Sequence, residues 1–329
     1  MILDFSQFSV EEILESQLKE FSEFPFILDF LVLWKEKKSI EVQTSGSTGL
    51  PKKLTFPIQS FIESAEMTGK FLDLKAGNTA LLCLPMQYIA AKMMLARAIV
   101  LQLKLICIIP NSIISINETI DFAAMTPMQA EKSISKLSFI KKIILGGMPV
   151  AYKLEQKLKH IPVQIFETFG MTETLSHIAM RNISANEKQF KTLENITISL
   201  SEKNTLCVNI PFIKEKITTN DIVEVIDNNH FIWKGRVDNI INSGGIKIIP
   251  EEIEQKLKPF INEEFYITSE KDELLGEKVV LIIESTAILE NIKQLFTQAK
   301  LLPYQTPKNI YLEEHLQRTE SGKIKRLKR

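Results

Sequence analysis

The chain has 329 residues, of which 45% are hydrophobic, and its 40 lysine and arginine residues balance its 40 aspartate and glutamate residues. This length predicts about two domains, and the lack of a basic excess argues against a dedicated nucleic-acid-binding protein. The three cysteines are scattered without a CxxC pair, so neither a zinc site nor a disulfide framework is predicted.

The N-terminal segment MILDFSQFSVEE has no basic start followed by an apolar run, so we expect no signal peptide. The most apolar stretch, AIVLQLKLICIIP, contains Lys104 and is too short to span a bilayer. These features predict a cytoplasmic protein without a membrane-inserted segment.

From about residue 79 the sequence alternates between apolar strands and helices. Strands are predicted at TALLCLP, KLICIIP, DFAAMTP, KKIILGG and VQIFETFG. Helices are predicted at YIAAKMMLARAIVL, PMQAEKSISKL and VAYKLEQKLKH. This order predicts a layered α/β domain with a mostly parallel sheet.

The pattern changes between about residues 196 and 236, where the short segments TISL, TLCVNI, IVEVID and HFIWKG predict a small antiparallel β subdomain. After Arg236, the helices PEEIEQKLKPF and ILENIKQLFTQAK accompany the strands EFYITS and KVVLIIE. Pro250 is placed at a helix start, and Ile253 and Leu257 share one face of that helix. We predict a large N-terminal domain over residues 1–236 and a smaller α+β domain over residues 237–329.

The segment TSGSTGLPKK, residues 44–53, does not match the phosphate loop GxxxxGK[ST], because Pro51 stands where the second glycine is required. Its glycines, hydroxyls and lysines are still the groups that a phosphate cradle needs. The alternative is a solvated turn rich in serine, threonine and glycine.

Two glycine-bearing loops follow neighbouring predicted strands. Gly146 and Gly147 come after IIL, and FGMTET, beginning at Phe169, ends the next strand. Ligands of parallel α/β sheets gather outside the carboxyl ends of the strands. Thr172 has a hydroxyl for a phosphate, and Glu173 has a carboxylate suited to Mg²⁺, although a helix-start charge is the simpler interpretation of Glu173.

Two further motifs are GRVDNIINSGGIKIIPEEIE, which follows the antiparallel region, and QRTESGKIKR, which lies near the end of the chain. Taken alone, NSGG is compatible with a hairpin turn, and KIKRLKR with a frayed basic tail. Together with TTND and the two earlier motifs, they resemble in text and order the acyl- and aryl-CoA ligases and their adenylate-forming relatives. The resemblance covers nearly everything after about residue 40.

The resemblance implies a reaction in which ATP activates a carboxylic acid as an acyl-adenylate, and coenzyme A then takes the acyl group. ATP and coenzyme A are thus the implied co-substrates, Mg²⁺ is the implied cofactor, and no nucleic-acid partner is implied. The residues implied for the mobile loop over the β- and γ-phosphates are Thr44, Ser45, Gly46, Ser47, Thr48, Gly49 and Lys52.

The remaining roles also follow from the resemblance. Gly147 and Phe169 are expected beside adenine, Thr172 at the α-phosphate and Glu173 at the magnesium ion. Lys323 is the expected catalytic lysine, carried by a mobile C-terminal domain.

Ribose binding is implied for Asp221 and Arg236, a hinge for Asp238, and the coenzyme A tunnel for Gly244 and Gly245. The sequence departs from the family where Phe169 replaces the usual tyrosine and where TTND replaces TGD. It also has only forty-three residues before the phosphate loop, which predicts a shortened N-terminal subdomain.

The segment LPMQYIAAKMML stands where relatives line the acyl pocket, so Tyr88 and Lys92 are the predicted acyl-substrate residues. A lysine that reaches solvent from the edge of the helix is the alternative for Lys92. Within the family, the chain most resembles compact o-succinylbenzoate–CoA ligases of menaquinone synthesis. Three alternatives stay open: a ligase for another aryl or fatty acid, an enzyme that loads a carrier protein, and a catalytically silent nucleotide-binding scaffold.

Overall fold

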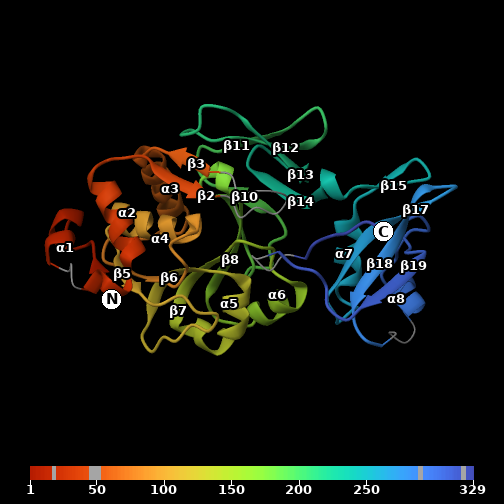
Figure 1. Cartoon of the computed structure of the whole chain (residues 1–329), viewed down its shortest axis with the longest axis horizontal. Coiled ribbons are helices and arrows are strands. Elements are labelled where there is room, and N and C mark those ends of the chain that lie inside the picture. The colour runs from red at the N-terminus through yellow and green to blue at the C-terminus, as the bar shows by residue number, and fades with distance from the viewer. Residues whose placement is uncertain (17–19, 44–52, 288–291, 320–323) are drawn as a thin grey trace. The chain divides into compact units, whose positions relative to one another are not determined.

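The structure is a computed structural model that describes residues 1–16, 20–43, 53–287, 292–319 and 324–329. Its internal contacts divide the chain into two compact units (Figure 1). The first unit comprises Met1–Ile198, Val208–Ile217 and Asn228–His230. The second comprises Ser199–Cys207, Thr218–Asp227 and Phe231–Arg329. The domain boundary that the sequence predicts after Arg236 remains a prediction.

The first unit is built on the parallel sheet that the alternating sequence predicts. Its parallel strands lie in the order β5 (Lys104–Cys107), β4 (Thr79–Leu82), β6 (Ile120–Met125), β7 (Ile140–Leu145) and β8 (Gln164–Gly170). Three antiparallel strands extend it, namely β1 (Ile2–Asp4) beside β5, and β9 (His177–Asn182) and β10 (Phe190–Thr192) beyond β8. The predicted α/β fold class is confirmed.

Helix α4 (Ile89–Val100) is buried over most of its surface because it is apolar almost all round. It packs against α3 (Ile58–Phe71) and against strands β4 and β5 (Figure 1). The other α-helices and strands of this unit are α1 (Val10–Ser16), α2 (Pro25–Lys35), α5 (Pro127–Lys132), α6 (Tyr152–Leu158) and the antiparallel pair β2 (Ile40–Gln43) and β3 (Lys53–Phe56).

The single helix expected over PMQAEKSISKL is interrupted. The α-helix starts at Pro127 behind a capping box formed by Thr126 and Gln129, and it ends at Lys132. Ser133 leaves helical geometry, with φ −113°, and its hydroxyl accepts the Ile114 amide at 2.7 Å. A 3-10 helix, Ile134–Phe139, completes the segment.

The predicted antiparallel region is present as β13 (Ile217–Val225) paired with β14 (His230–Arg236). Strands β11 (Thr197–Leu200) and β12 (Thr205–Asn209) precede them and straddle the division between the units. The rest of the second unit contains β15 (Ile241–Ser243), β16 (Ile246–Ile248), α7 (Pro250–Leu257), β17 (Phe265–Asp272), β18 (Gly276–Glu284), α8 (Ile292–Gln298) and β19 (Asn309–Glu313).

The sheet of the second unit has the order β16-β15-β18-β17, and β19 pairs with β18 in parallel. Pro250 occupies the first turn of α7, and Ile253 and Leu257 are fully buried on its inner face, as the sequence predicts. They pack in one cluster with Phe296 of α8 and Leu281 of β18. This α+β unit therefore has a hydrophobic core of its own.

The C-terminal residues 324–329 dock on this unit, so the alternative of a frayed basic tail is wrong for them. Ile324 packs against the cluster of Tyr266, Val280, Ile282 and Leu316. Ion pairs join Arg326 to Glu254, Lys328 to Glu277, and Arg329 to Glu313. Arg326, Lys328 and Arg329 thus each meet a carboxylate of this unit.

Across the described segments, no helix combines the length and the apolar character needed to cross a membrane.

Candidate active site

The carboxyl ends of β7 and β8 lie side by side, as expected for parallel neighbours. Just beyond β7, a Cβ on Gly146 would lie 2.7 Å from the Thr168 hydroxyl, so β8 closely flanks this backbone. Gly147 has φ +87°, and a Cβ there would meet no atom within 4 Å. The backbone at Gly147 thus favours glycine and borders open space, which is compatible with the predicted place of adenine.

Phe169 and Gly170 close strand β8. The Phe169 ring lies 5.7 Å from the Phe190 ring, centroid to centroid. A Cβ on Gly170 would lie 2.4 Å from the Ser176 carbonyl oxygen and 2.5 Å from the His177 Cα. The returning chain therefore passes directly over Gly170, and only glycine fits without a backbone shift.

A tight turn connects β8 to β9. The Thr174 hydroxyl donates to the Ser176 carbonyl at 2.6 Å and accepts the Met171 amide at 3.0 Å. Leu175 is fully buried with φ 64° and ψ −41°, a backbone conformation that is unfavourable for leucine. Such strain persists only where the surrounding structure enforces it, and it is concentrated at functional sites.

This turn presents the two residues predicted to act on the phosphates. Thr172 is half-buried and Glu173 is exposed at the start of the turn's 3-10 helix, Thr172–Thr174. No described residue forms an ion pair with Glu173, and no group of three metal-binding side chains occurs in the described parts of the chain. One open carboxylate fits Mg²⁺, which commonly takes one or two protein carboxylates and completes its shell with phosphate and water.

Arg97, on the inner face of α4, is a candidate that sequence reasoning missed. It is only 2% exposed, yet no carboxylate among the described residues pairs with it. Its Nη2 donates to the Ser176 hydroxyl at 2.9 Å and lies 3.5 Å from His177 Nδ1, while its Nε has no partner. Burial lowers the pKa of Arg97 to about 9, so the guanidinium still carries its charge near neutral pH.

The predicted acyl-substrate residues lie on the first turn of the same helix. Tyr88 is 52% exposed at the N-cap of α4. Lys92 is half-buried, and its ammonium donates to the Glu41 carbonyl of β2 at 2.7 Å. Burial lowers the pKa of Lys92, and the Glu41 carboxylate partly opposes this shift. Lys92 thus has a partner within the protein, and its contact with substrate remains a prediction.

In the second unit, the two predicted ribose-binding residues are direct neighbours. Asp221 of β13 and Arg236 of β14 are register partners, 3.8 Å apart between carboxylate and guanidinium. The Trp233 indole donates to Asp221 at 2.9 Å. Arg236 also donates to the carboxylate of the predicted hinge residue Asp238 at 2.8 Å. Their roles in binding remain predictions.

Gly244 and Gly245 form the turn of the β15–β16 hairpin, with φ values of +56° and +80°. Two successive residues with positive φ are the requirement of the common two-residue hairpin turn, which explains the pair of glycines. The hairpin interpretation of NSGG is therefore correct, and a role in binding coenzyme A remains a prediction.

Two of the predicted elements lie outside the described residues. They are the phosphate loop with Thr44, Ser45, Gly46, Ser47, Thr48, Gly49 and Lys52, and the catalytic lysine, Lys323. Near the latter, a β-bridge joins Arg318 to Ile324.

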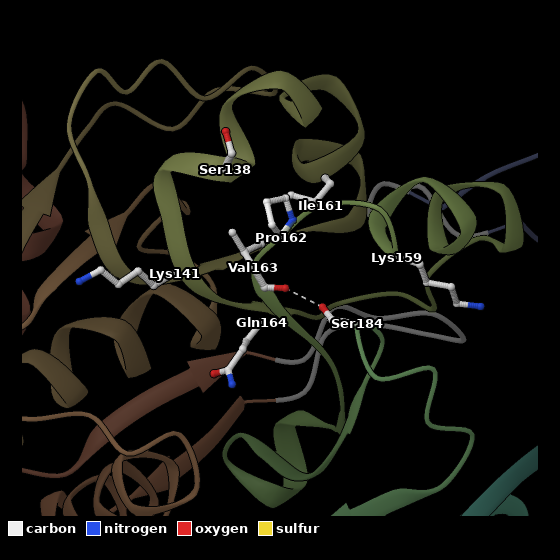
Figure 2. A pocket seen from close by; sticks show the side chains of 8 residues that line it. All are labelled: Ser138, Lys141, Lys159, Ile161, Pro162, Val163, Gln164 and Ser184. Carbon is white, nitrogen blue, oxygen red and sulfur yellow. Dashed lines mark hydrogen bonds between the residues drawn. The ribbon is translucent and has the colours of Figure 1, made fainter.

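A hollow of about 500 Å³ lies at the other end of the strands. Figure 2 shows the residues that line it. Lys141 and Gln164 on its wall lie near the starts of β7 and β8, and the Ser184 hydroxyl donates to the Val163 carbonyl at 2.7 Å. Its two lysines are ion-paired, Lys141 with Asp121 and Lys159 with Glu155. This hollow is therefore separate from the strand ends that carry the predicted site.

A family model described as AMP-binding enzyme matches residues 42–203. Over almost the whole chain, the structure resembles an acyl-CoA synthetase (AMP-forming)/AMP-acid ligase II-like protein from Dyadobacter fermentans. The two are 31% identical with a TM-score of 0.68, and the match covers 98% of this chain and 97% of that one. The chain belongs to the family of AMP-binding, AMP-forming CoA ligases, and it is an enzyme of that class.

More particular likenesses lie within this family. The chain is 24% identical to a 2-succinylbenzoate–CoA ligase of Listeria monocytogenes over 97% of its own length and 74% of the relative's. A second such ligase, from Haemophilus influenzae, is also 24% identical, over 80% of this chain and 64% of the relative. The fold resembles the O-succinylbenzoate coenzyme A synthetase of Bacillus subtilis in complex with ATP and magnesium, with a TM-score of 0.72, 18% identity and coverage of 86% and 68%.

Proposed function

We propose that the acid this ligase activates is o-succinylbenzoate and that the product serves menaquinone synthesis. The observation that carries the proposal is Arg97, a buried guanidinium without a carboxylate partner among the described residues. Charges that are buried in proteins are normally paired. o-Succinylbenzoate brings two carboxylates, one that reacts and one that remains free to pair with such a cation. The names of the relatives point to the same acid.

The proposed reaction has two steps, adenylation and thioester formation. An oxygen of the reacting carboxylate attacks the α-phosphorus of ATP, and the bond to pyrophosphate breaks to leave the acyl-adenylate. The thiol of coenzyme A then attacks the acyl carbonyl, loses its proton, and displaces AMP. In-line displacement at phosphorus is accelerated mainly by positioning and by cations that meet the developing charge.

The residues divide this work according to their chemistry. The hydroxyls and glycines of Thr44 to Gly49, with Lys52, hold the departing pyrophosphate, while Thr172 contacts the α-phosphate. Glu173 would hold Mg²⁺, which supplies positive charge beside the phosphates when it is bound. Asp221 and Arg236 bind the ribose, and Lys323 reaches both the acyl carboxylate and the α-phosphate.

A comparison of acids tests the proposal. Initial rates of pyrophosphate release are measured on the wild type with o-succinylbenzoate, benzoate and medium-chain fatty acids, with and without coenzyme A. We expect the highest kcat/KM for o-succinylbenzoate. If a monocarboxylate is used more efficiently, the assignment of the acid fails and the ligase class stands. Stimulation by a carrier protein in place of coenzyme A would favour the carrier-loading alternative, and no turnover of any acid would favour a silent scaffold.

Two variants decide which cation meets the second carboxylate. Losing one charge-assisted hydrogen bond of about 1.5–3 kcal/mol corresponds to a rise in KM of about tenfold or more. The sequence predicts this effect for Lys92→Ala. Because the Lys92 ammonium is bonded to the Glu41 carbonyl, we expect the larger rise for Arg97→Gln. In both variants KM for ATP should change little, and a larger effect of Lys92→Ala would return the role to Lys92.

A further inference from the structure

His177, the first residue of β9, lies between two helices of the first unit. Its Nε2 is 3.1 Å from the Thr68 hydroxyl of α3, and its Nδ1 is 3.5 Å from Nη2 of Arg97 on α4. The Ser176 hydroxyl beside it accepts from the same Nη2. The imidazole therefore bridges α3 and the unpaired guanidinium, and no step of the reaction derived above uses it.

The groups around His177 favour one of the two neutral forms of the imidazole ring. The Thr68 hydroxyl donates its single proton to the Ser64 carbonyl, 3.0 Å away inside α3. With its proton used in this way, the hydroxyl offers His177 a lone pair, which favours the tautomer with the proton on Nε2. The Nδ1 lone pair then faces the Arg97 donor. This arrangement requires the neutral imidazole, because a doubly protonated ring would turn an N–H toward the guanidinium.

The surroundings favour that neutral form. Burial, followed by the charge of Arg97, lowers the pKa of His177 well below its usual value. Among the described residues, the imidazole contacts neutral groups of α3 and the turn, and Arg97 is the only cation that shifts its pKa. Arg97 thus meets acceptors on Ser176 and His177 that orient it without cancelling its charge.

The turn between β8 and β9 also connects His177 to Thr172 and Glu173, the residues predicted to act on the phosphates. His177 pairs with Gly170 across the bulge between β8 and β9. Between them, the Thr174 hydroxyl bonds the chain at Met171 and Ser176, and the turn holds Leu175 in its strained conformation. A single hydrogen-bonded turn therefore carries Glu173 at one end and the acceptors for Arg97 at the other.

We propose that His177 is a positioning residue that makes the enzyme selective for acids with a second carboxylate. As a neutral acceptor held by Thr68, it orients the Arg97 guanidinium and leaves the positive charge for the substrate. A carboxylate at this position would pair with Arg97 and take the place of the substrate's second carboxylate. This inference rests on the proposed function for the identity of the acid. The contacts among Thr68, His177 and Arg97 do not depend on which acid is bound.

The test compares His177→Glu with His177→Gln, and uses His160→Glu at an exposed histidine as the matched control. The readout is the ratio of kcat/KM for o-succinylbenzoate to kcat/KM for benzoate. His177→Glu should lower this ratio about tenfold or more, the scale of one charge-assisted bond. His177→Gln keeps a donor and an acceptor and should keep the ratio within about threefold, as should the control.

A second measurement does not depend on activity. In ¹⁵N spectra of the protein, which has four histidines, the His177 signals are identified by their loss in His177→Gln. They should show protonated Nε2, unprotonated Nδ1 and no titration between about pH 6 and pH 8, a window around the usual histidine pKa. Thr68→Val removes the acceptor for Nε2 and should disturb this tautomer even if His177→Glu does not fold.

The outcomes separate the two proposals. An Nδ1-protonated or titrating ring, or an unchanged ratio in a folded His177→Glu, would overturn the role of His177. An equal loss with both acids would mean that the histidine only supports the fold. Preference of the wild type for benzoate would instead overturn the choice of acid, and the spectra would still test the arrangement around Arg97.

Discussion

At the scale of single residues, Gly170 lies where the turn between β8 and β9 leaves no room for a side chain. A Cβ would lie about 1 Å inside normal contact with backbone atoms of Ser176 and His177, which cannot rotate away as a side chain would. We expect Gly170→Ala to lower the free energy of unfolding by roughly 1–3 kcal/mol, the usual range for overpacking. Urea denaturation measures this, and pyrophosphate release should fall with it. A variant as stable and active as the wild type would show that the turn adapts.

Lys323 carries the prediction with the largest expected effect. A cation that meets charge developing on the phosphoryl group commonly contributes about a hundredfold or more to the rate. We expect Lys323→Ala to reduce adenylate formation by about this factor. Thioester formation from supplied acyl-adenylate should be spared, because no pyrophosphate leaves in that step. Single-turnover assays of each step measure the difference, and equal damage to both would contradict the assigned role.

At the scale of elements, a buried ion network joins α6 to strands β8 and β9 behind the site. Arg181 of β9 lies 2.6 Å from Glu155 of α6 and 2.6 Å from Glu167 of β8. Glu167 also accepts the Val150 amide at 2.8 Å. Breaking a buried pair leaves an uncompensated charge, so this network holds the helix to the strands that carry Phe169 and the turn.

The network predicts a pH dependence of stability. Burial by itself raises the pKa of Glu155, but bonds and charge from Arg181 more than offset it and hold the pKa at about 2, below the ordinary 4.5. As the pH falls, Glu155 is therefore protonated in the unfolded chain before it is protonated in the folded one. The stability that its carboxylate contributes above about pH 4.5 is lost as the pH falls toward 2. We expect the gap in unfolding free energy between wild type and Glu155→Gln to narrow by roughly 3 kcal/mol over that interval.

Denaturant unfolding at several pH values measures this gap. Glu131→Gln is the matched control, because Glu131 pairs with Lys157 at 3.2 Å with both side chains more than half exposed. Such surface pairs contribute little, so its gap should stay small at every pH. A gap for Glu155→Gln that does not depend on pH would contradict the low pKa.

At the scale of the whole molecule, we predict that the C-terminal domain rotates between adenylation and thioester formation. Asp238 lies in the short 3-10 helix Val237–Asn239, where its carboxylate accepts from Asn220 and Arg236. A few boundary residues suffice to absorb a domain rotation. Asp238→Pro fixes φ, and we expect adenylation to persist while thioester formation fails.

Asp238→Ala is the control for this hinge. It removes the bonds to Asn220 and Arg236 and leaves φ free, so it should retain more of the thioester step than the proline variant. An unchanged overall rate in Asp238→Pro would exclude this position as the hinge.

Sequence by itself determined the parallel strands, the helices between them and the class of enzyme. Strand and helix patterns report on burial at neighbouring positions, and residues such as Gly147, Gly244 and Gly245 report on local backbone geometry. These signals depend on residues that are close in the sequence, so they can be recognised without knowing how the helices and strands pack together. The helix expected over PMQAEKSISKL is nevertheless interrupted at Ser133, whose hydroxyl accepts the amide of Ile114, a residue distant in the sequence.

Only the tertiary structure decided which charges are paired. Lys92 and Arg97 both stand in one apolar helix, and nothing in their local sequence shows that one donates to the Glu41 carbonyl while the other has no carboxylate among the described residues. The link from Thr68 through His177 to Arg97 likewise spans distant parts of the chain. Whether a charged side chain is buried and whether it has a partner depend on how the elements pack. The sequence alone therefore does not show which cation has no carboxylate partner within the protein.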